Sequence, residues 1–235
     1  MPIMRLAAKL PCRVARLSSN VRRHTTPAMD LDSAFEESAK LAEGLLAVVD
    51  LPLLDDSPRV QASDAACSLA LEHWHAVRAL LQDGFLASAS VVHRAQFEAV
   101  LRSIWLSYAA SEADVSKITA TLNLESEQAA KNLPQVQQMM EAIGKQAPSQ
   151  AHSALARFKD NSWKALNSYA HAGIHPLRRH ADGHPSALAH AVLSNANGLA
   201  VFTCMQAVVL SGEQPLQRQV LDLAAKHSSC MPPPL

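Results

Sequence analysis

The sequence predicts an all-α protein: a single bundle of six or seven helices with a disordered N-terminal leader and a disordered C-terminal tail. Three observations predict this fold. Glycine is rare, with only seven among the 235 residues, whereas alanine and leucine are abundant. Apolar residues also recur at helical spacing along most of the chain. Alanine and leucine lose little conformational freedom in a helix, so we expect residues 29–226 to form one helical domain.

The first 28 residues differ in composition from the rest. They are basic and contain no acid, which leaves 15 basic against 21 acidic residues in the remainder. Two interpretations of this leader stay open. It is either an Arg-rich transit peptide or an unstructured extension that precedes a true start at Met29. The acidic remainder argues against broad RNA binding, which relies on basic surface.

The helices follow in order along the chain. The first carries Ser33 and Glu36 at the spacing of a capping box and ends before the stretch 50–58, which is rich in Pro and Asp. The second runs from about Ser63 to Gln82, and Gly84 allows a tight turn into the third. These signals predict a helical hairpin.

The third helix, residues 85–110, is apolar around roughly 220° of its circumference, so we expect it to be central and mostly buried. Arg94 and Glu98 border this apolar arc. Glu four residues after Arg is the weaker order for supporting an isolated helix, so we expect the pair to have a partner on another helix. The candidate partners are side chains near the end of the fifth helix: Asn167, Tyr169 and His171.

Residues 112–145 predict shorter helices, broken near Pro134, that lie across the outside of the bundle. The fifth helix covers residues 149–171, and an interruption at the letters KDNS stays open. These segments contain no catalytic or binding motif until the histidine-rich stretch at the end of the fifth helix.

The sixth helix, residues 186–210, is entered through Pro185 and is strongly apolar. Its longest apolar run carries Gln206 and stops short of the roughly 18 to 20 residues that span a bilayer, so we expect no membrane segment. A short helix at residues 215–226 follows, and we expect residues 227–235 to form a disordered tail.

The cysteines predict neither a disulfide framework nor a thiolate zinc site, because they lie far apart and form no CxxC pair. A reducing compartment fits this pattern, and we expect a cytoplasmic protein. The four residues are Cys12, Cys67, Cys204 and Cys230.

The stretch NSYAHAGIHPLRRHADGH, residues 167–184, contains four of the chain's eleven histidines. A metal site is one interpretation, since His171 and His175 have the spacing that places two ligands on one helical face. Gly173 and Pro176 oppose it, because they predict that the helix ends between the two histidines. We therefore expect neither a metal nor another cofactor.

A second interpretation of the stretch is structural. In the last turn of its helix, His171 would interact favourably with exposed carbonyl groups and with the helix dipole. The histidines after Pro176 would be polar residues in a solvated loop. Under this interpretation the stretch needs no function.

A third interpretation comes from two segments taken together. HRAQFEAVLRSIWL in the third helix and KALNSYAHAGIHPL at the end of the fifth resemble uncharacterised bacterial helical proteins related to the HEPN superfamily, over roughly residues 62–210. HEPN domains are helical bundles, often dimeric, of toxin–antitoxin and phage-defence systems, and their catalytic members are metal-independent ribonucleases. The resemblance implies a homodimer, a protein partner or an RNA partner, and no membrane.

The catalytic motif of that superfamily is an Arg, often followed by a polar residue such as Asn, and then a His. Asn167 and His171 take the polar and His positions, but Leu166 stands at the Arg position. Arg94 on a neighbouring helix would have to supply the missing cation. Arg179 also has a suitable spacing, to His184, but we expect both to lie in a loop. The candidate site residues are His171, Asn167, Arg94 and Glu98.

Two functions follow from this resemblance. The favoured one is a non-catalytic binding or interaction module, acting in a bacterial defence or toxin system. The alternative is a metal-independent ribonuclease in which His171 is the general base and Arg94 or Arg179 steadies the phosphate.

Overall fold

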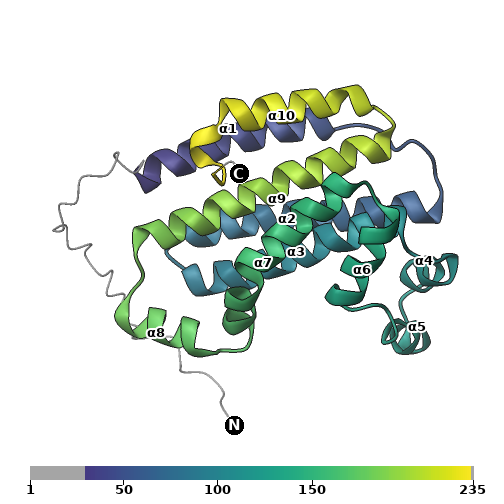
Figure 1. Ribbon diagram of the computed structural model, residues 1–235, viewed down its shortest axis with the longest axis horizontal. Helices are drawn as coiled ribbons and strands as arrows, with labels where there is room; N and C mark the ends of the chain where they lie inside the picture. Colours follow the sequence, from purple (N-terminus) through teal and green to yellow (C-terminus); the bar gives the residue numbers. More distant parts are fainter. Residues whose placement is uncertain (1–29, 234–235) are drawn as a thin grey trace, which may run out of the picture.

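The computed structural model describes residues 30–233, and the predicted basic leader, residues 1–28, lies outside them. The described residues form ten α-helices and two short 3-10 helices with no strand, so the all-α prediction is confirmed (Figure 1). The helices are α1 (Leu31–Val49), α2 (Pro58–Gln82), α3 (Leu86–Tyr108), α4 (Glu112–Thr119), α5 (Leu124–Ala130), α6 (Val136–Gln146), α7 (Ser149–Ala170), α8 (Ile174–Asp182), α9 (Ser186–Ser211), η1 (Gln214–Leu216), α10 (Gln217–Lys226) and η2 (Ser228–Cys230).

The predicted number of six or seven helices is wrong. Residues 112–146 divide into α4, α5 and α6, and α8 forms where a loop was expected. The fifth predicted helix, in contrast, is continuous as α7 and has no interruption at the letters KDNS. α4 and α5 lie at the edge of the bundle, as predicted, and α5 buries no residue (Figure 1). α6 differs from the prediction, because Met139, Met140 and Ile143 are buried in the core.

Two helix starts differ from the predicted ones. α1 begins before Ser33 and has no side-chain cap, so the capping box expected from Ser33 and Glu36 does not form. α2 begins at Pro58, because the Ser57 hydroxyl accepts a hydrogen bond from the Val60 N–H and proline is well suited to the first turn. Both helices thus begin nearer the N-terminus than predicted, and only the start of α2 has a side-chain cap.

The α2–α3 hairpin forms as predicted. Gly84 has a φ of 79°, a left-handed conformation that glycine adopts without strain. The Phe85 N–H then donates to the Leu80 carbonyl at 2.7 Å and closes the turn. Most of the side chains along α3 are buried, so the expectation of a central third helix is confirmed.

α9 runs through the middle of the bundle and contacts α1, α2, α3 and α10 (Figure 1). By length and composition it is apolar enough to cross a membrane, but 67% of its most apolar window is buried among the other helices. This burial is what the core helix of a folded domain shows. The first core lies between α9 and the layer of α1 and α10, and the second between α3, α6 and α7.

A buried amide joins the first core to the end of the chain. Asn197 accepts hydrogen bonds from Ser38 Oγ at 2.9 Å and Trp74 Nε1 at 2.8 Å. Its Nδ2 donates to the Cys230 carbonyl at 2.9 Å. One side chain of α9 therefore ties together α1, α2 and η2.

The predicted disordered tail is wrong for residues 227–233, the part that the structure describes. His227 is buried with its Nδ1 2.8 Å from Glu37 Oε2, and Cys230 is fully buried against the first core. These contacts hold the segment on α1 and α9. The Pro- and Ser-rich composition of the segment did not indicate this order.

Candidate functional site

The turn between α7 and α8 holds the start of the histidine-rich stretch. His171 caps α7, where its N–H donates to the Asn167 carbonyl at 3.2 Å, and Ala172 follows with a φ of 49°. A Cβ on Gly173 would lie 2.5 Å from Ser168 Oγ and 3.2 Å from the Ser168 carbonyl oxygen. A side chain at residue 173 would therefore force Ser168 or the turn to shift. α7 ends at Ala170 with His171 as its C-cap, so the prediction that a helix end separates His171 from His175 is confirmed.

His171 and His175 belong to different helices. His171 is exposed, whereas the His175 N–H donates to Ser168 Oγ at 3.3 Å and its ring lies nearly parallel to that of Tyr169 at 6.5 Å between centroids. The prediction that Pro176 holds His175 in an extended conformation is wrong, because both residues belong to α8. Pro176 lies in the first turn of α8, where its missing N–H would have had no helical partner.

The metal interpretation gains no support from these positions. The two histidines do not share one helical face. Within residues 30–233 no group of three His, Cys, Asp or Glu side chains gathers in a way that could hold a metal ion.

The segment after Pro176 was expected to be a loop and forms α8 instead. Gly173 is its N-cap, and Gly183 ends it with a φ of 82°. The glycines and the proline that indicated a loop therefore mark the two ends and the first turn of a helix. Arg179 lies on this helix, and His184 follows it half-buried.

Arg94 and Glu98 pair with each other along α3, with 2.8 Å between Nη2 and Oε1. The expected partner on another helix exists, but it is Trp163 of α7, whose ring centroid lies 4.9 Å from the Arg94 guanidinium carbon. The side chains of Arg94 and Glu98 are 27% and 38% exposed. The structure gives neither residue a hydrogen bond to Asn167, Tyr169 or His171, and Arg94 Nε is buried without a partner.

The other residues of the motif are less exposed than His171. Leu166, at the position of the missing Arg, is buried in the second core, and Asn167 is half-buried. Burial raises the pKa of Tyr169, and the positive charge of Arg179 opposes that rise, which places Arg179 near the end of α7. A cation of α8 therefore acts on the end of α7.

Comparison with known proteins gives one match. Residues 67–233 match a family described as a family of unknown function (DUF6988). The chain belongs to this family. No curated protein and no solved structure matches the chain. The DUF6988 region begins within α2 and ends after η2, so it contains all four candidate site residues and the whole of α8.

The DUF6988 region also contains a buried histidine that the sequence analysis missed. His93 is 2% exposed, and its Nδ1 lies 3.0 Å from Gln96 Oε1, while Gln96 Nε2 donates to the Ala196 carbonyl. Its Nε2 has no partner, and its ring meets the edge of Phe158 at 5.2 Å. Burial lowers the pKa of His93 to about 4. Its position within the apolar arc of α3 was the sequence signal for it.

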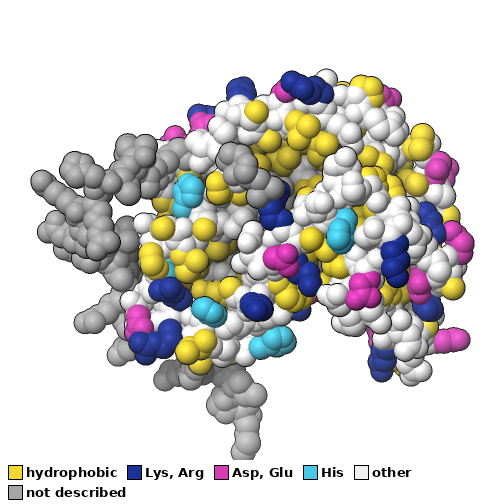
Figure 2. Space-filling view, viewed as in Figure 1, with side chains coloured by type: hydrophobic (Ala, Val, Ile, Leu, Met, Phe, Trp, Pro, Cys, Tyr) yellow, Lys and Arg dark blue, Asp and Glu magenta, His cyan; other side chains and the backbone are white. Residues whose placement is uncertain are grey.

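The outer surface of the DUF6988 region exposes apolar side chains on α8. This helix buries none of its residues, and Ile174 and Leu177, three residues apart on one face, are 71% and 62% exposed. His175 and Arg179 lie on the opposite face, near Tyr169. Figure 2 shows apolar, basic and histidine side chains together over this part of the molecule. The apolar face of α8 is therefore exposed to solvent.

Proposed function

We propose that this DUF6988 protein is a non-catalytic interaction module, a HEPN-like helical bundle that binds a partner protein through α8 in a bacterial defence or toxin system. The carrying observation is the outward apolar face of α8, with Ile174 and Leu177 exposed side by side. Burying two such side chains contributes about 1.5–3 kcal/mol each, so a face that forgoes this burial is typical of a surface kept for a partner.

The packing of α3 against α7 supports the HEPN-like part of the proposal. It brings the segment HRAQFEAVLRSIWL of α3 next to the helix that carries KALNSYAH, the two segments on which the resemblance rests. The family match is to a family of unknown function, so it neither adds an activity nor removes one.

The environment of Arg94 favours binding over catalysis. A cation that stabilises a cleaved phosphate must be free to contact it. Glu98 neutralises Arg94 at 2.8 Å, and Trp163 covers its guanidinium. The alternative, a ribonuclease using His171, draws on a different observation: His171 is exposed, and Arg179 lies near the same turn.

An RNA cleavage assay separates the two functions. Purified wild type, His171→Ala, Arg94→Ala and Arg179→Ala would be incubated with single-stranded RNA, with and without EDTA. We expect the wild type to cleave no faster than His171→Ala. Removal of the exposed His180 on α8 is the matched control, because it changes a histidine outside the motif.

Activity that survives EDTA and disappears in His171→Ala, but not in His180→Ala, would overturn the proposal. Its further loss in Arg94→Ala or in Arg179→Ala would then identify the cation that acts on the phosphate.

A further inference from the structure

The exposed face of α8 carries a basic group beside its apolar residues. Arg178 follows Ile174 by one helical turn and adjoins Leu177, so the three side chains share one side of the helix. Arg178 is 69% exposed, and its Nη2 pairs with Asp182 at 2.7 Å. A guanidinium has five N–H donors, so this contact leaves others for a second carboxylate. The face is apolar with a basic edge.

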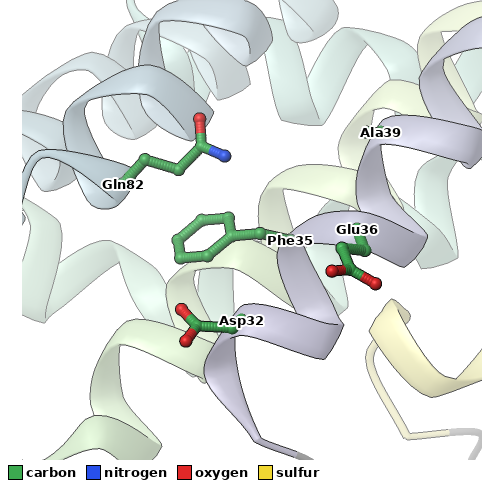
Figure 3. Close-up of a pocket in the computed structure, with 5 residues that line it drawn as sticks. All are labelled: Asp32, Phe35, Glu36, Ala39 and Gln82. Atoms are coloured by element: carbon green, nitrogen blue, oxygen red, sulfur yellow. The ribbon is translucent and has the colours of Figure 1, made fainter.

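A hollow of about 420 Å³ lies between the start of α1 and the end of α2. Figure 3 shows the ring of Phe35 reaching from α1 toward α2, with the Asp32 carboxylate next to the ring, the Glu36 carboxylate farther along α1 and the Gln82 amide on the α2 side. The last turn of α2 contains no basic residue, so its exposed carbonyl groups add to the negative potential. The hollow is apolar at its base and acidic at its edge.

These two surfaces are complementary in apolar character and in charge. The apolar residues of α8 match the Phe35 base of the hollow, and Arg178 matches the carboxylates at its edge. Within one chain α8 packs on α7 and α3, so its outer face is not used by these contacts. α8 and the start of α1 lie at the same end of the long axis of the molecule (Figure 1).

We propose that the partner of α8 is a second copy of this chain, whose α1–α2 hollow receives it. A two-fold axis near that end of the bundle makes both contacts at once, because α8 of each chain enters the hollow of the other. This inference rests on the proposed function and names its partner. Dimerisation does not depend on catalysis. The RNA cleavage assay can therefore contradict the proposed function without contradicting the dimer, and the test below can contradict the dimer alone.

The test is the mass of the full chain by sedimentation velocity across a concentration series. We expect wild type to dimerise. Arg178→Glu and Glu36→Arg should each raise the dimer dissociation constant by about tenfold or more, because each places like charges together. The chain with both changes should recover dimerisation, since the charges are exchanged. Leu177→Ser tests the apolar part of the contact and should weaken the dimer too.

Arg218→Glu is the matched control. Arg218 is 81% exposed and pairs with Asp222 at 2.9 Å in the same i,i+4 arrangement as Arg178 with Asp182, but it lies on α10. It should leave the dimer unchanged, and circular dichroism identifies any variant that has lost its fold.

Three results would overturn the inference. One is a wild type that stays monomeric at every concentration. Another is an Arg178→Glu variant that dimerises like Arg218→Glu, or a double variant that remains as weak as the single ones. The third is a single-stranded RNA oligonucleotide that binds monomers in an Arg178-dependent manner, which would make RNA the occupant of this face.

Discussion

The guanidinium of Arg94 lies 4.9 Å from the centre of the Trp163 indole, and this stacking joins α3 to α7. Arg94 also pairs with Glu98 on its own helix. Arg94→Ala removes both contacts and should lower the free energy of unfolding by about 1–2 kcal/mol. Glu98→Ala keeps the stacking and should cost only about 0.5 kcal/mol. Urea denaturation measures both.

Arg218→Ala serves as the reference for an exposed ion pair without an aromatic partner, and we expect a loss of less than about 0.5 kcal/mol. If Arg94→Ala costs no more than this reference, the stacking on Trp163 does not stabilise the packing of α3 on α7.

The close approach of α8 to α7 at Gly173 gives a second prediction. In Gly173→Ala the new Cβ meets Ser168 Oγ at 2.5 Å, so the Ser168 side chain or the turn must shift, at a cost of about 1–3 kcal/mol. Adding Ser168→Ala removes the clashing oxygen and should recover part of this loss, as measured by thermal unfolding of the single and double variants. Strictly additive losses would show that the Ser168 hydroxyl is not what excludes a side chain at residue 173.

The sequence predicted the fold where local signals agree. Composition and helical spacing predicted the α2–α3 hairpin, the burial of α3 and the apolar α9, because these features follow from the residues of each segment alone. The order of the tail was missed, since Cys230 is held by Asn197, a contact between residues far apart in the chain. Spacing along one segment carries no information on such contacts.

The candidate site shows the same limit. The end of α7 was predictable from Gly173. Glycine and proline mark helix ends as well as loops, so they do not distinguish α8 from the predicted loop. The partner of Arg94 depends on the register of α3 against α7, so Trp163 could not be distinguished from Asn167 or Tyr169. The roles of His171, Asn167, Arg94 and Glu98 in binding or catalysis stay predictions.

The buried His93 predicts a dependence of stability on pH. Its pKa is lowered to about 4 by burial, whereas an unfolded histidine has a pKa of about 6.5. The unfolded chain therefore binds more protons between these values, and stability rises with pH through this window. The contribution of neutral His93 to the free energy of unfolding is fully present above a pH of about 6.5 and is lost as the pH falls toward about 4. The total loss is on the order of 3 kcal/mol.

His93→Asn isolates that contribution, because asparagine keeps an N–H donor near Gln96 and does not titrate. Denaturant unfolding of both proteins from pH 7 to pH 4 gives the difference in free energy of unfolding. This difference should shift in favour of the variant as the pH falls. A difference that is independent of pH would mean that His93 has the same pKa in the folded and unfolded chains.

The last prediction concerns Asn197, which holds the C-terminal segment on the first core. Asn197→Ala leaves three buried groups without this partner: Ser38 Oγ, Trp74 Nε1 and the Cys230 carbonyl. Three such losses should cost about 3–6 kcal/mol of stability. The rate of amide hydrogen exchange should increase more in residues 228–231 than in the rest of the bundle. The reason is that Asn197 Nδ2 is the polar link from α9 to that segment. Thr203→Val, a buried change on the same helix, removes only a bond to the carbonyl of Leu199 one turn earlier and should leave exchange in the segment unchanged. If both variants accelerate exchange equally, α9 holds the segment by packing alone.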